Sequence, residues 1–471
     1  MRVFLGIDTG TSILKGHVVD ENGRSVAYAS RAREQTDAKA ATRTTTPGIW
    51  WDEWCRICNE LISQLPASAE IACVASTAMV PNVCLLDSSG ESVGPTILFY
   101  DDRAYDIERG LDMELGTDRW QNEVLSKLMW YCREIGPLPH DGLTFTTTHS
   151  YITLKLTGKT SLDTVTAAET GSIYVPGIGW NGELLRRFEL GDLSMPEVVA
   201  PVSVVGSVTP EAAAATGLAE GTPVVAGTAD SVASLIGAGA RHKGDTLIYY
   251  GTFNCAARLD ANISDVLSGE HRPYPIDWLT SVPRAGHQIR DVAKMLFPGD
   301  SPYRDFDSAA DASPAGANGL IFLQDVDLLN TTVSSSPRGA LLNLQIGHTA
   351  ADIARAVLES FAYALAVTLE ISGVPSGELL AGGGGARSQE WRQIVTDVLG
   401  LPQRYLRHSD RGHGSALLAL AGVDSDAFET VTDNLLREAD VVRPSGRGPL
   451  YASSLAHYRE ALGRLPEVHT W

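Results

Sequence analysis

Short apolar runs rich in β-branched residues alternate along the chain with longer segments in which apolar positions recur every three or four residues. The short runs predict strands. They lie at residues 3–7, 71–74, 83–86, 222–226, 246–250 and 378–381. The longer spacing predicts a buried helix over residues 351–371 and further helices over residues 389–399 and 453–462. Strands that alternate with helices predict a mixed α/β fold.

The helix predicted over residues 389–399 carries signals at both ends. Ser388 precedes it and can accept a hydrogen bond as its N-cap. Gly400 follows it and can adopt the left-handed conformation that ends many helices, while Pro402 prevents continuation.

Two similar patterns of strand, turn and strand lie about half a chain apart. The first predicted strand runs into Gly10 and Thr11, and another apolar strand follows. Much later, residues 246–250 run into Gly251 and Thr252, again followed by an apolar strand. The two Gly-Thr pairs are 241 positions apart. This repeat predicts two similar halves, each with a small polar turn, that enclose one ligand.

The chain has 471 residues, enough for two to four domains at about 100–200 residues each, and two large domains are the simplest expectation. It carries 57 acidic and 37 basic residues, a formal net charge of −20. Such a surface repels a polyphosphate backbone, so we do not expect nucleic acid as a partner. A small anion such as ATP is compatible with this charge, because backbone N–H groups can hold its phosphates.

The sequence does not predict a membrane or a secreted protein. No apolar run reaches the roughly 18–20 residues that span a bilayer, and Asp8 interrupts the N-terminal apolar run too early for a signal peptide. Six cysteines are few for this length. Cys55 and Cys58 form a C-x-x-C pair, but no second pair nearby completes a zinc site. We therefore expect free thiols and a location in the reducing cytoplasm.

A first candidate site lies where the first predicted strand ends. Asp8 stands near the end of this strand, and Gly10 permits a tight turn. Thr11 and Ser12 add hydroxyl groups, and Lys15 adds a positive charge. Such a hairpin can cradle phosphates with its N–H groups while the carboxylate holds Mg²⁺ through water. The spacing is not that of a Walker A loop, and a plain hairpin with a polar turn is the alternative interpretation.

A second candidate site follows the strand predicted over residues 222–226. Small residues lead to one carboxylate, Asp230, and they leave room for a substrate beside it. A carboxylate next to a substrate hydroxyl can act as its general base. The alternative is that Asp230 only N-caps a helix that begins at Ser231.

A third candidate site contains the four consecutive glycines of residues 382–385, between a predicted strand and a predicted helix. Without side chains, the backbone can support a flat ligand, and the N-terminus of the following helix favours negative charge. A flexible loop is the alternative, but four glycines between a strand and a helix favour a ligand site.

Taken together and in this order, these stretches resemble the FGGY family of carbohydrate kinases, within the superfamily of sugar kinases, actin and heat-shock ATPases. The resemblance covers almost the whole chain. The matching segments are residues 6–15, 85–87, 95–103, 127–130, 156–158, 227–230, 251–252, 337–339, 356–359, 383–388, 391–393 and 414–418. Each segment is modest alone, but their number and order are specific to the family.

The resemblance implies two actin-like, ribonuclease H-like ATPase domains, each a mixed central sheet flanked by helices, with a cleft between them. It places sugar binding, the first phosphate motif and the catalytic aspartate in residues 1–235. It places the second phosphate motif and adenosine binding in residues 236–471. Family members are often dimers, so a homodimer is an expectation.

The resemblance also implies roles for single residues. Asp230 becomes the general base that takes the proton from the sugar hydroxyl, and Asp8 becomes the carboxylate associated with Mg²⁺, through water. The residues expected around the phosphates of ATP are Gly10, Thr11, Ser12, Lys15, Gly251 and Thr252. The residues expected along the adenosine are Gly384, Gly385, Ala386, Ser388 and Gln393. The residues expected at the substrate, together with Asp230, are Met79, Phe99 and Asp101.

The chain departs from the family pattern in the substrate region. Met79, Val80 and Pro81 stand where members usually carry polar residues such as Gln-Met-His. Phe99 replaces a tryptophan that often packs on the substrate, and Phe253 occupies a position where a small hydroxyl residue is common. Because these side chains offer few hydrogen bonds to a sugar, a standard xylulose or glycerol pocket is not expected.

Residues 227–233 resemble the pentulose-kinase branch of the family, in particular its D-ribulokinase members. We therefore expect ATP-dependent phosphorylation of the terminal hydroxyl of a ketopentose, of the D-ribulose or D-xylulose type. A polyol, a sugar acid or a deoxy-ketohexose is the alternative substrate. A non-catalytic regulator that binds a sugar or nucleotide, and an actin-like assembly or chaperone ATPase, are the other classes of protein. The presence of Asp230 favours the enzyme.

Overall fold

The computed structural model describes residues 1–33, 44–117, 121–134, 136, 142–251, 254–271, 273–282, 285–324, 339–373, 375–407 and 410–464. The chain forms two compact units. The first consists of Met1–Arg241, Ala261–Pro275 and Asp410–Leu435, and the second of His242–Asp260, Ile276–Ser409 and Leu436–Trp471. Each unit is thus built from three separate stretches of sequence. The division into domains of residues 1–235 and 236–471 stays a prediction.

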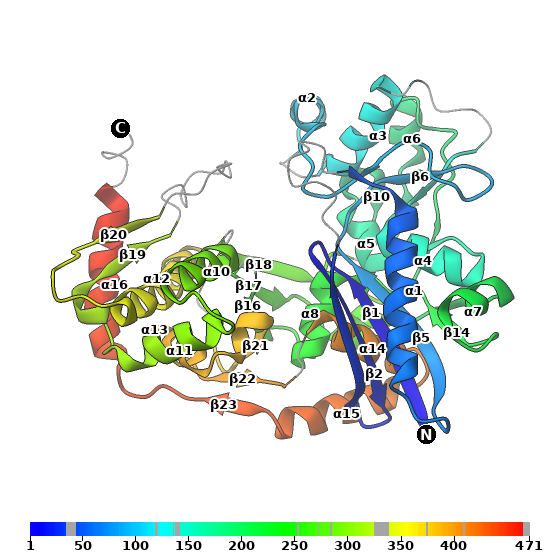
Figure 1. Cartoon of the computed structure of the whole chain (residues 1–471). Helices are drawn as coiled ribbons and strands as arrows, with labels where there is room; N and C mark the ends of the chain where they lie inside the picture. Colours follow the sequence, from blue (N-terminus) through cyan, green and yellow to red (C-terminus); the bar gives the residue numbers. More distant parts are fainter. Residues whose placement is uncertain are drawn as a thin grey trace. The chain divides into compact units, whose positions relative to one another are not determined.

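A seven-stranded mixed sheet forms the centre of the first unit (Figure 1). Six of its strands follow the order β13-β14-β5-β1-β2-β3, and β15 also pairs with β5. The strands are β1 (Arg2–Thr9), β2 (Ile13–Asp20), β3 (Ser25–Ala32), β5 (Glu70–Ala78), β13 (Val204–Ser207), β14 (Pro223–Val225) and β15 (Thr228–Ala229). Because β1 is antiparallel to β2 and parallel to β5, Asp8 lies between Lys15 and Thr77 in neighbouring strands.

Helices cover both faces of this sheet. They include α1 (Pro47–Ser63), α4 (Thr148–Thr157), α7 (Pro210–Thr216), α8 (Asp230–Ala238), α14 (Arg411–Ala421) and α15 (Ser425–Arg437). Successive residues of a strand point to opposite faces. Ile7 shares an apolar core with Trp50 of α1, whereas Gly6 lies against α14. A Cβ atom on Gly6 would lie 1.9 Å from the backbone nitrogen of Ala416, so only glycine permits this approach.

A second apolar core of the first unit lies among shorter elements. It contains residues of α2 (Tyr105–Leu115), α3 (Glu123–Glu134), α5 (Thr164–Glu169), α6 (Gly182–Arg187), β6 (Cys84–Leu86) and β8 (Thr144–Thr146). The remaining elements of this unit are β4 (Thr44–Thr45), β7 (Thr96–Ile97), β9 (Ser161–Asp163), β10 (Tyr174–Val175), β11 (Gly179–Trp180), β12 (Glu197–Val199) and α9 (Ile263–Leu267).

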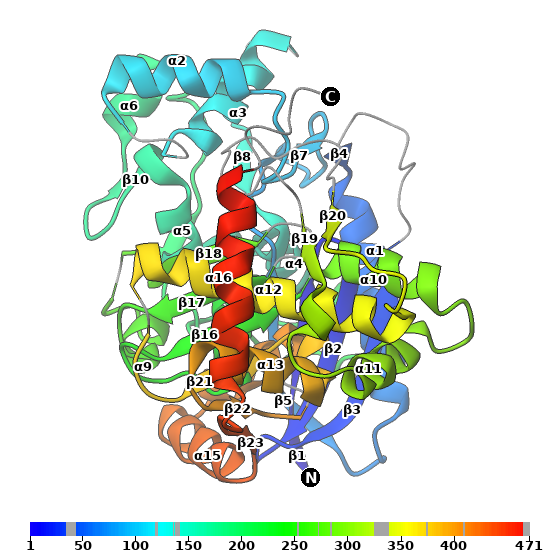
Figure 2. The same cartoon turned by 90° about the vertical axis from the view of Figure 1, so that its left-hand side faces the viewer.

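A six-stranded mixed sheet forms the centre of the second unit, in the order β18-β17-β16-β21-β22-β23. The strands are β16 (Thr246–Tyr250), β17 (Asn254–Leu259), β18 (Ile276–Val282), β21 (Leu379–Gly382), β22 (Gln403–Tyr405) and β23 (Asp440–Val442). Its other elements are α10 (Ala285–Leu296), α11 (Pro302–Ala312), β19 (Ile321–Leu323), β20 (Ala340–Leu342), α12 (Ala350–Ser372), α13 (Gln389–Leu399) and α16 (Gly448–Arg464). In Figure 2, α16 runs across α12, and it contacts both α12 and α13.

Six strands of each central sheet have the same spatial order and directions. In each, three consecutive strands form an antiparallel meander, and beside the first of them lie two parallel strands and an antiparallel edge strand. The edge strand precedes its neighbour along the chain in the first unit and follows it in the second. The hairpin of β1 and β2 therefore corresponds to that of β16 and β17. This correspondence explains the half-chain repeat of Gly-Thr turns, and the prediction of a mixed α/β fold is confirmed.

Most predicted elements are present at the expected places. All six apolar runs contain or overlap strands, and the three predicted helices are α12, α13 and α16. α16 begins five residues before the predicted start at residue 453. Ser388 caps α13 as predicted, and Gly400 has the left-handed conformation. All six cysteines are free. In the part of the chain that is described, no helix is long and apolar enough to cross a membrane.

Candidate active site

Asp8 is a buried carboxyl group near the C-terminal end of β1. Its side chain is 2% exposed and accepts a hydrogen bond from the Thr77 hydroxyl at 3.2 Å. The pKa of Asp8 is raised to about 7, because burial, helped by the charge of Asp230, outweighs the lowering effect of the charges of Arg411 and Lys15. Because burial disfavours the ionised form of this carboxyl group, a cation bound beside it would stabilise that form. The residues present therefore fit Mg²⁺ beside Asp8.

The structure does not offer a complete protein cage for such a cation. Among the residues that the structure describes, no group of three or more His, Cys, Asp or Glu side chains is placed to hold a metal. Mg²⁺ commonly binds through one or two carboxylates, several waters and the phosphates of its nucleotide. A single carboxylate at Asp8 suits that mode of binding.

Asp230 lies at the same edge of the first sheet as Asp8. β15 is parallel to β5 and pairs with it at Thr77, which is also the residue opposite Asp8. Parallel strands bring their C-terminal ends to one edge, and Asp230 directly follows β15. The alternative role of Asp230 as an N-cap is wrong, because Ala229 occupies the N-cap position and Asp230 is the first helical residue of α8.

The carboxylate of Asp230 forms an ion pair with Arg411, the first residue of α14. The same guanidinium donates from Nε to the Ser234 hydroxyl at 3.1 Å. The two charged side chains are partly buried, 16% exposed for Asp230 and 27% for Arg411. Sequence reasoning missed Arg411. The available signal was a run of charged and polar residues just before the small residues of the motif at positions 414–418.

Sequence reasoning also missed Asp410, which contacts β2 of the hairpin. Its carboxylate caps α14 by accepting from the His413 N–H at 3.1 Å. It also lies 3.5 Å from Lys15 Nζ and 3.2 Å from His17 Nε2. Burial raises the pKa of Asp410, but the hydrogen bond and charge of His17, the charge of Lys15 and the His413 N–H outweigh it, so the pKa is held well below its usual range. Lys15 is therefore held at the start of α14.

The turn between β1 and β2 contains Gly10 and the exposed residues Thr11 and Ser12. Glycine is needed at position 10, because a Cβ atom there would lie 2.7 Å from the Ile13 carbonyl oxygen. The Thr11 hydroxyl donates to the sulfur of Met79 at 3.2 Å. The structure thus brings a predicted phosphate residue and a predicted substrate residue into contact.

Met79 itself is 2% exposed and belongs to the core beneath the hairpin. Its carbonyl accepts from the Asn82 amide at 3.0 Å, and the Asn82 side-chain oxygen accepts from the Phe99 N–H at 2.8 Å. Phe99 is half-buried and packs edge-on against Tyr100 at 5.0 Å between ring centroids. Asn82 therefore joins the two predicted substrate residues, a role that the sequence did not reveal.

Asp101 is held by its own loop. Its two carboxylate oxygens accept from Nε and Nη2 of Arg103 at 2.9 and 2.7 Å, and Oδ1 also accepts the Arg103 N–H at 3.0 Å. Arg103 in turn lies over the ring of Trp130 at 4.8 Å. This arrangement favours a structural role for the Asp101 carboxylate, and contact with a substrate stays a prediction.

A buried polar cluster supports the strand that leads to Asp230. His149 Nε2 lies 3.0 Å from Asp163 Oδ2, and both side chains are fully buried. Asp163 Oδ1 accepts from the Thr228 hydroxyl at 2.9 Å and from two N–H groups at the start of α5. Asp163 therefore ties α5 to β15.

In the second unit, the four glycines form an ordered connection from β21 through a 3₁₀ turn (Gly384–Arg387) to α13. Gly383 has a φ of 90°, and a Cβ atom there would lie 2.6 Å from the Tyr250 carbonyl oxygen. A Cβ atom on Gly385 would lie 2.5 Å from the Trp391 ring, whereas one on Gly384 would meet nothing within 4 Å. Packing thus requires Gly383 and Gly385, and Gly384 borders open space. Ala386 is buried.

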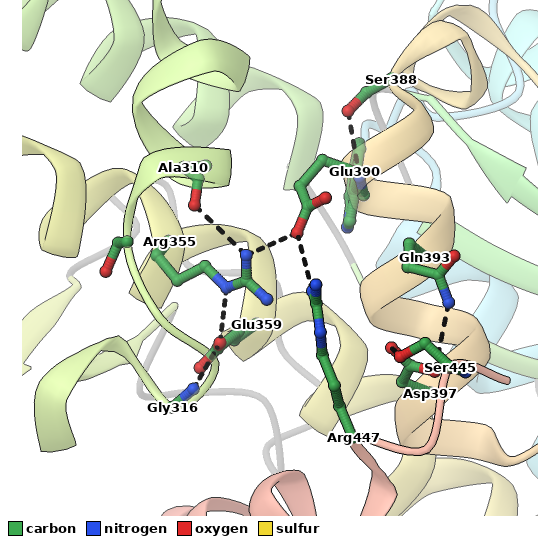
Figure 3. A network of polar contacts seen from close by, with 12 residues as sticks. Ala310, Gly316, Arg355, Glu359, Ser388, Glu390, Gln393, Asp397, Ser445 and Arg447 are labelled. Atoms are coloured by element: carbon green, nitrogen blue, oxygen red, sulfur yellow. Dashed lines mark hydrogen bonds and ion pairs between the residues drawn. The ribbon is translucent and has the colours of Figure 1, made fainter.

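The remaining predicted nucleotide residues have different surroundings. Ser388 accepts from the Trp391 N–H at 3.1 Å as the N-cap of α13. The Gln393 amide donates to Asp397 at 3.1 Å and to the Arg443 carbonyl at 3.0 Å, so its donor already serves the fold (Figure 3). Gly251 follows β16. Thr252 and Phe253 lie outside the described residues.

A buried ionic network supports the start of α13 (Figure 3). Arg355 of α12 is 1% exposed and pairs with Glu359 at 2.8 Å and with Glu390 at 2.5 Å. Glu390 belongs to the first turn of α13, directly after the glycine stretch. Arg355 also donates to the Tyr451 hydroxyl of α16. Three helices are therefore joined at the base of the predicted adenosine segment.

Comparison with known proteins gives consistent matches over the chain. Residues 3–237 match the N-terminal domain of the FGGY family of carbohydrate kinases, and residues 275–423 match its C-terminal domain. A xylulose kinase of Bacillus subtilis is 25% identical over 467 residues, which are 95% of this chain and 94% of that protein. An autoinducer-2 kinase of Klebsiella pneumoniae is 26% identical over 451 residues, 86% of this chain and 82% of that protein.

The solved structure of a xylulose kinase from Rhodospirillum rubrum is similar to this chain over 99% of both molecules. The TM-score is 0.78 at 26% sequence identity. This similarity, together with the two equivalent sheets, confirms the predicted class of two actin-like domains.

Proposed function

This chain belongs to the FGGY family of carbohydrate kinases, and from that premise we propose that it transfers the terminal phosphoryl group of ATP to the terminal hydroxyl of a ketopentose. The enzyme class, a sugar kinase, follows from the family, whose members use ATP. The ketopentose, of the D-xylulose or D-ribulose type, is proposed because similar proteins over most of the chain are xylulose kinases.

The observation that carries the proposed mechanism is the pair of carboxylates at one edge of the first sheet, Asp8 and Asp230. In our proposal, Asp230 accepts the proton of the attacking sugar hydroxyl as its oxygen forms a bond to the phosphorus, and ADP leaves. Asp8 would hold Mg²⁺, and the bound cation would supply positive charge against the phosphates. Phosphoryl transfer needs such positioning and charge compensation more than covalent chemistry.

The other predicted residues complete this proposal. Gly10, Thr11 and Ser12 offer N–H and hydroxyl donors to the phosphates, and Lys15, fixed by Asp410, offers a positive charge. The proposed partners of ATP from the second unit are Gly251, Thr252, Gly384, Gly385, Ala386, Ser388 and Gln393. The open space at Gly384 supports a ligand on the backbone there, whereas the occupied amide of Gln393 favours contact through another part of that side chain.

A second substrate class is favoured by a specific observation. The autoinducer-2 kinase similarity extends over most of this chain at 26% identity, close to that of the xylulose kinases. The buried Met79 and half-buried Phe99 also present less hydrogen-bonding capacity than a polar substrate segment would. Autoinducer-2, the substrate in the name of those relatives, is therefore the alternative substrate. A homodimer and a cytoplasmic location stay predictions.

The proposal is tested by ADP release from Mg-ATP across ketopentoses, polyols, sugar acids and deoxy-ketohexoses. We expect one sugar to stand out, and Asp230→Ala to lower kcat about 10²-fold or more, as for loss of a positioned general base. Asp106→Asn, which changes an exposed carboxylate on α2, is the matched control and should keep full activity. ADP release that no ketopentose stimulates, or an Asp230→Ala variant with the kcat of the wild type, would contradict the proposal.

Binding is measured separately by thermal shift with the same panel, because a ligand that binds the native state raises Tm whether or not it reacts. A sugar that raises Tm without any turnover in the wild type would indicate the non-catalytic regulator instead.

A further inference from the structure

We propose that Arg411 is the positioning residue of the general base: it holds one oxygen of the Asp230 carboxylate so that the other faces the sugar hydroxyl. This inference rests on the proposed function of Asp230. Arg411 lies on a helix 181 positions away in the sequence, and no motif of the sequence assigned it a role.

The guanidinium of Arg411 contacts α8 at two side chains. Nη1 of Arg411 pairs with Oδ2 of Asp230, and Nε donates to the Ser234 hydroxyl at 3.1 Å. That hydroxyl in turn donates to the backbone carbonyl of Asp230 at 2.9 Å. Because the fork of an arginine is planar and rigid, two contacts fix its orientation. The ion pair uses Oδ2, and in our proposal Oδ1 is the oxygen that accepts the proton of the sugar hydroxyl.

The backbone that carries Arg411 is itself fixed. α14 and α8 approach so closely that a Cβ atom on Gly414 would lie 1.9 Å from the Ala233 carbonyl oxygen, and one on Gly237 would lie 2.5 Å from that of Asp410. The preceding residue, Asp410, caps α14 and pairs with Lys15 of the hairpin. The backbone of Arg411 therefore cannot shift if the Asp230 carboxylate rotates. Keeping the ion pair thus restricts the carboxylate to one orientation.

The test compares Arg411→Ala and Arg411→Lys with the wild type, and uses Arg31→Gln as the control. Arg31 is an exposed arginine paired with Glu60 in the same unit. A misplaced catalytic group costs up to about 10²-fold, so we expect kcat of Arg411→Ala to fall about 10- to 100-fold. The Kd of the sugar, measured on the intact enzyme by calorimetry, should stay near the wild-type value, since in our proposal Arg411 contacts Asp230 and not the sugar.

Chemical rescue separates positioning from a structural effect. Guanidinium ion, added well below concentrations that unfold the enzyme, should restore part of the kcat of Arg411→Ala and none of that of Asp230→Ala. Arg411→Lys should retain more activity than Arg411→Ala, and it serves as the second variant if the alanine variant does not fold. Wild-type kcat in Arg411→Ala, or a loss that guanidinium does not restore, would overturn the inference. A fully active Asp230→Ala enzyme would instead overturn the proposed base.

Discussion

The buried charge of Arg355 gives the sharpest stability prediction. Replacement by methionine keeps an unbranched side chain of similar reach and removes the guanidinium. Arg355 is 1% exposed and Glu359 is 2% exposed, so the substitution leaves a carboxylate inside the second unit with two weaker donors, the Gly316 N–H at 2.9 Å and the Tyr363 hydroxyl at 3.1 Å. Removal of one member of a buried ion pair costs about 3–5 kcal/mol.

The cost depends on pH, and its sign follows from Glu359. Burial already raises the pKa of Glu359 above its usual value although Arg355 lowers it, so loss of Arg355 raises the pKa further. A buried carboxyl group with a raised pKa costs the folded state little while it is protonated. As the pH rises and the group ionises, it lowers the free energy of unfolding. We therefore expect Arg355→Met to be more destabilising at pH 8 than at pH 5.

The assay is urea unfolding of the wild type, Arg355→Met, Glu359→Leu and the double variant at both pH values. Replacing a whole buried pair by apolar residues is often nearly neutral. The double variant should therefore be more stable than the sum of the single losses predicts, by at least about 1–2 kcal/mol of coupling. A loss below about 1 kcal/mol in Arg355→Met, or strict additivity in the double variant, would refute the reasoning.

Three further predictions concern single substitutions. Asp352 has a pKa lowered to about 2, because hydrogen bonds from its neighbours, that of Ser313 first, outweigh burial, which raises it. The carboxylate of Asp352 thus stabilises the fold above about pH 4, and this stabilisation is lost as the pH falls toward 2. Asp352→Asn should therefore lower Tm at pH 7. A difference in Tm between the wild type and this variant that does not become smaller in acid would contradict the prediction. Gly414→Ala should destabilise by about 1–3 kcal/mol through the clash with the Ala233 carbonyl. Gly110→Ala, in α2 with nothing within 4 Å of the added carbon, should stabilise by about 0.5–1 kcal/mol, and equal Tm shifts in these two glycine variants would contradict the packing argument.

Local patterns predicted the local structure well. The strands, α12 and α13 follow from the spacing of apolar residues, and the caps at Ser388 and Gly400 follow from residue types next to a helix end. These signals involve residues within a few positions of one another. The sequence did not reveal that α8 begins at Asp230, because an aspartate at the first helical position and one at the N-cap look alike in sequence.

The support of the candidate site was not predictable in the same way. Arg411 acts on Asp230 over 181 positions, and Asp410 acts on Lys15 from the other end of the chain. Such pairs depend on how α14 packs on the first sheet, which a local pattern does not contain. The family resemblance predicted which residues carry the chemistry, and the structure adds which residues contact them.

The position of α14 also sets the order in which the protein is completed during synthesis. The helix that packs on β1, β2 and β5 begins 170 positions after Arg241, where the first long stretch of its unit ends. At about 5–20 residues per second, the ribosome needs about 10–30 s to cover that distance. During this time the face of the sheet that carries Gly6 lacks its covering helix. This face of the sheet is therefore completed by α14 only when almost the last tenth of the protein is being made.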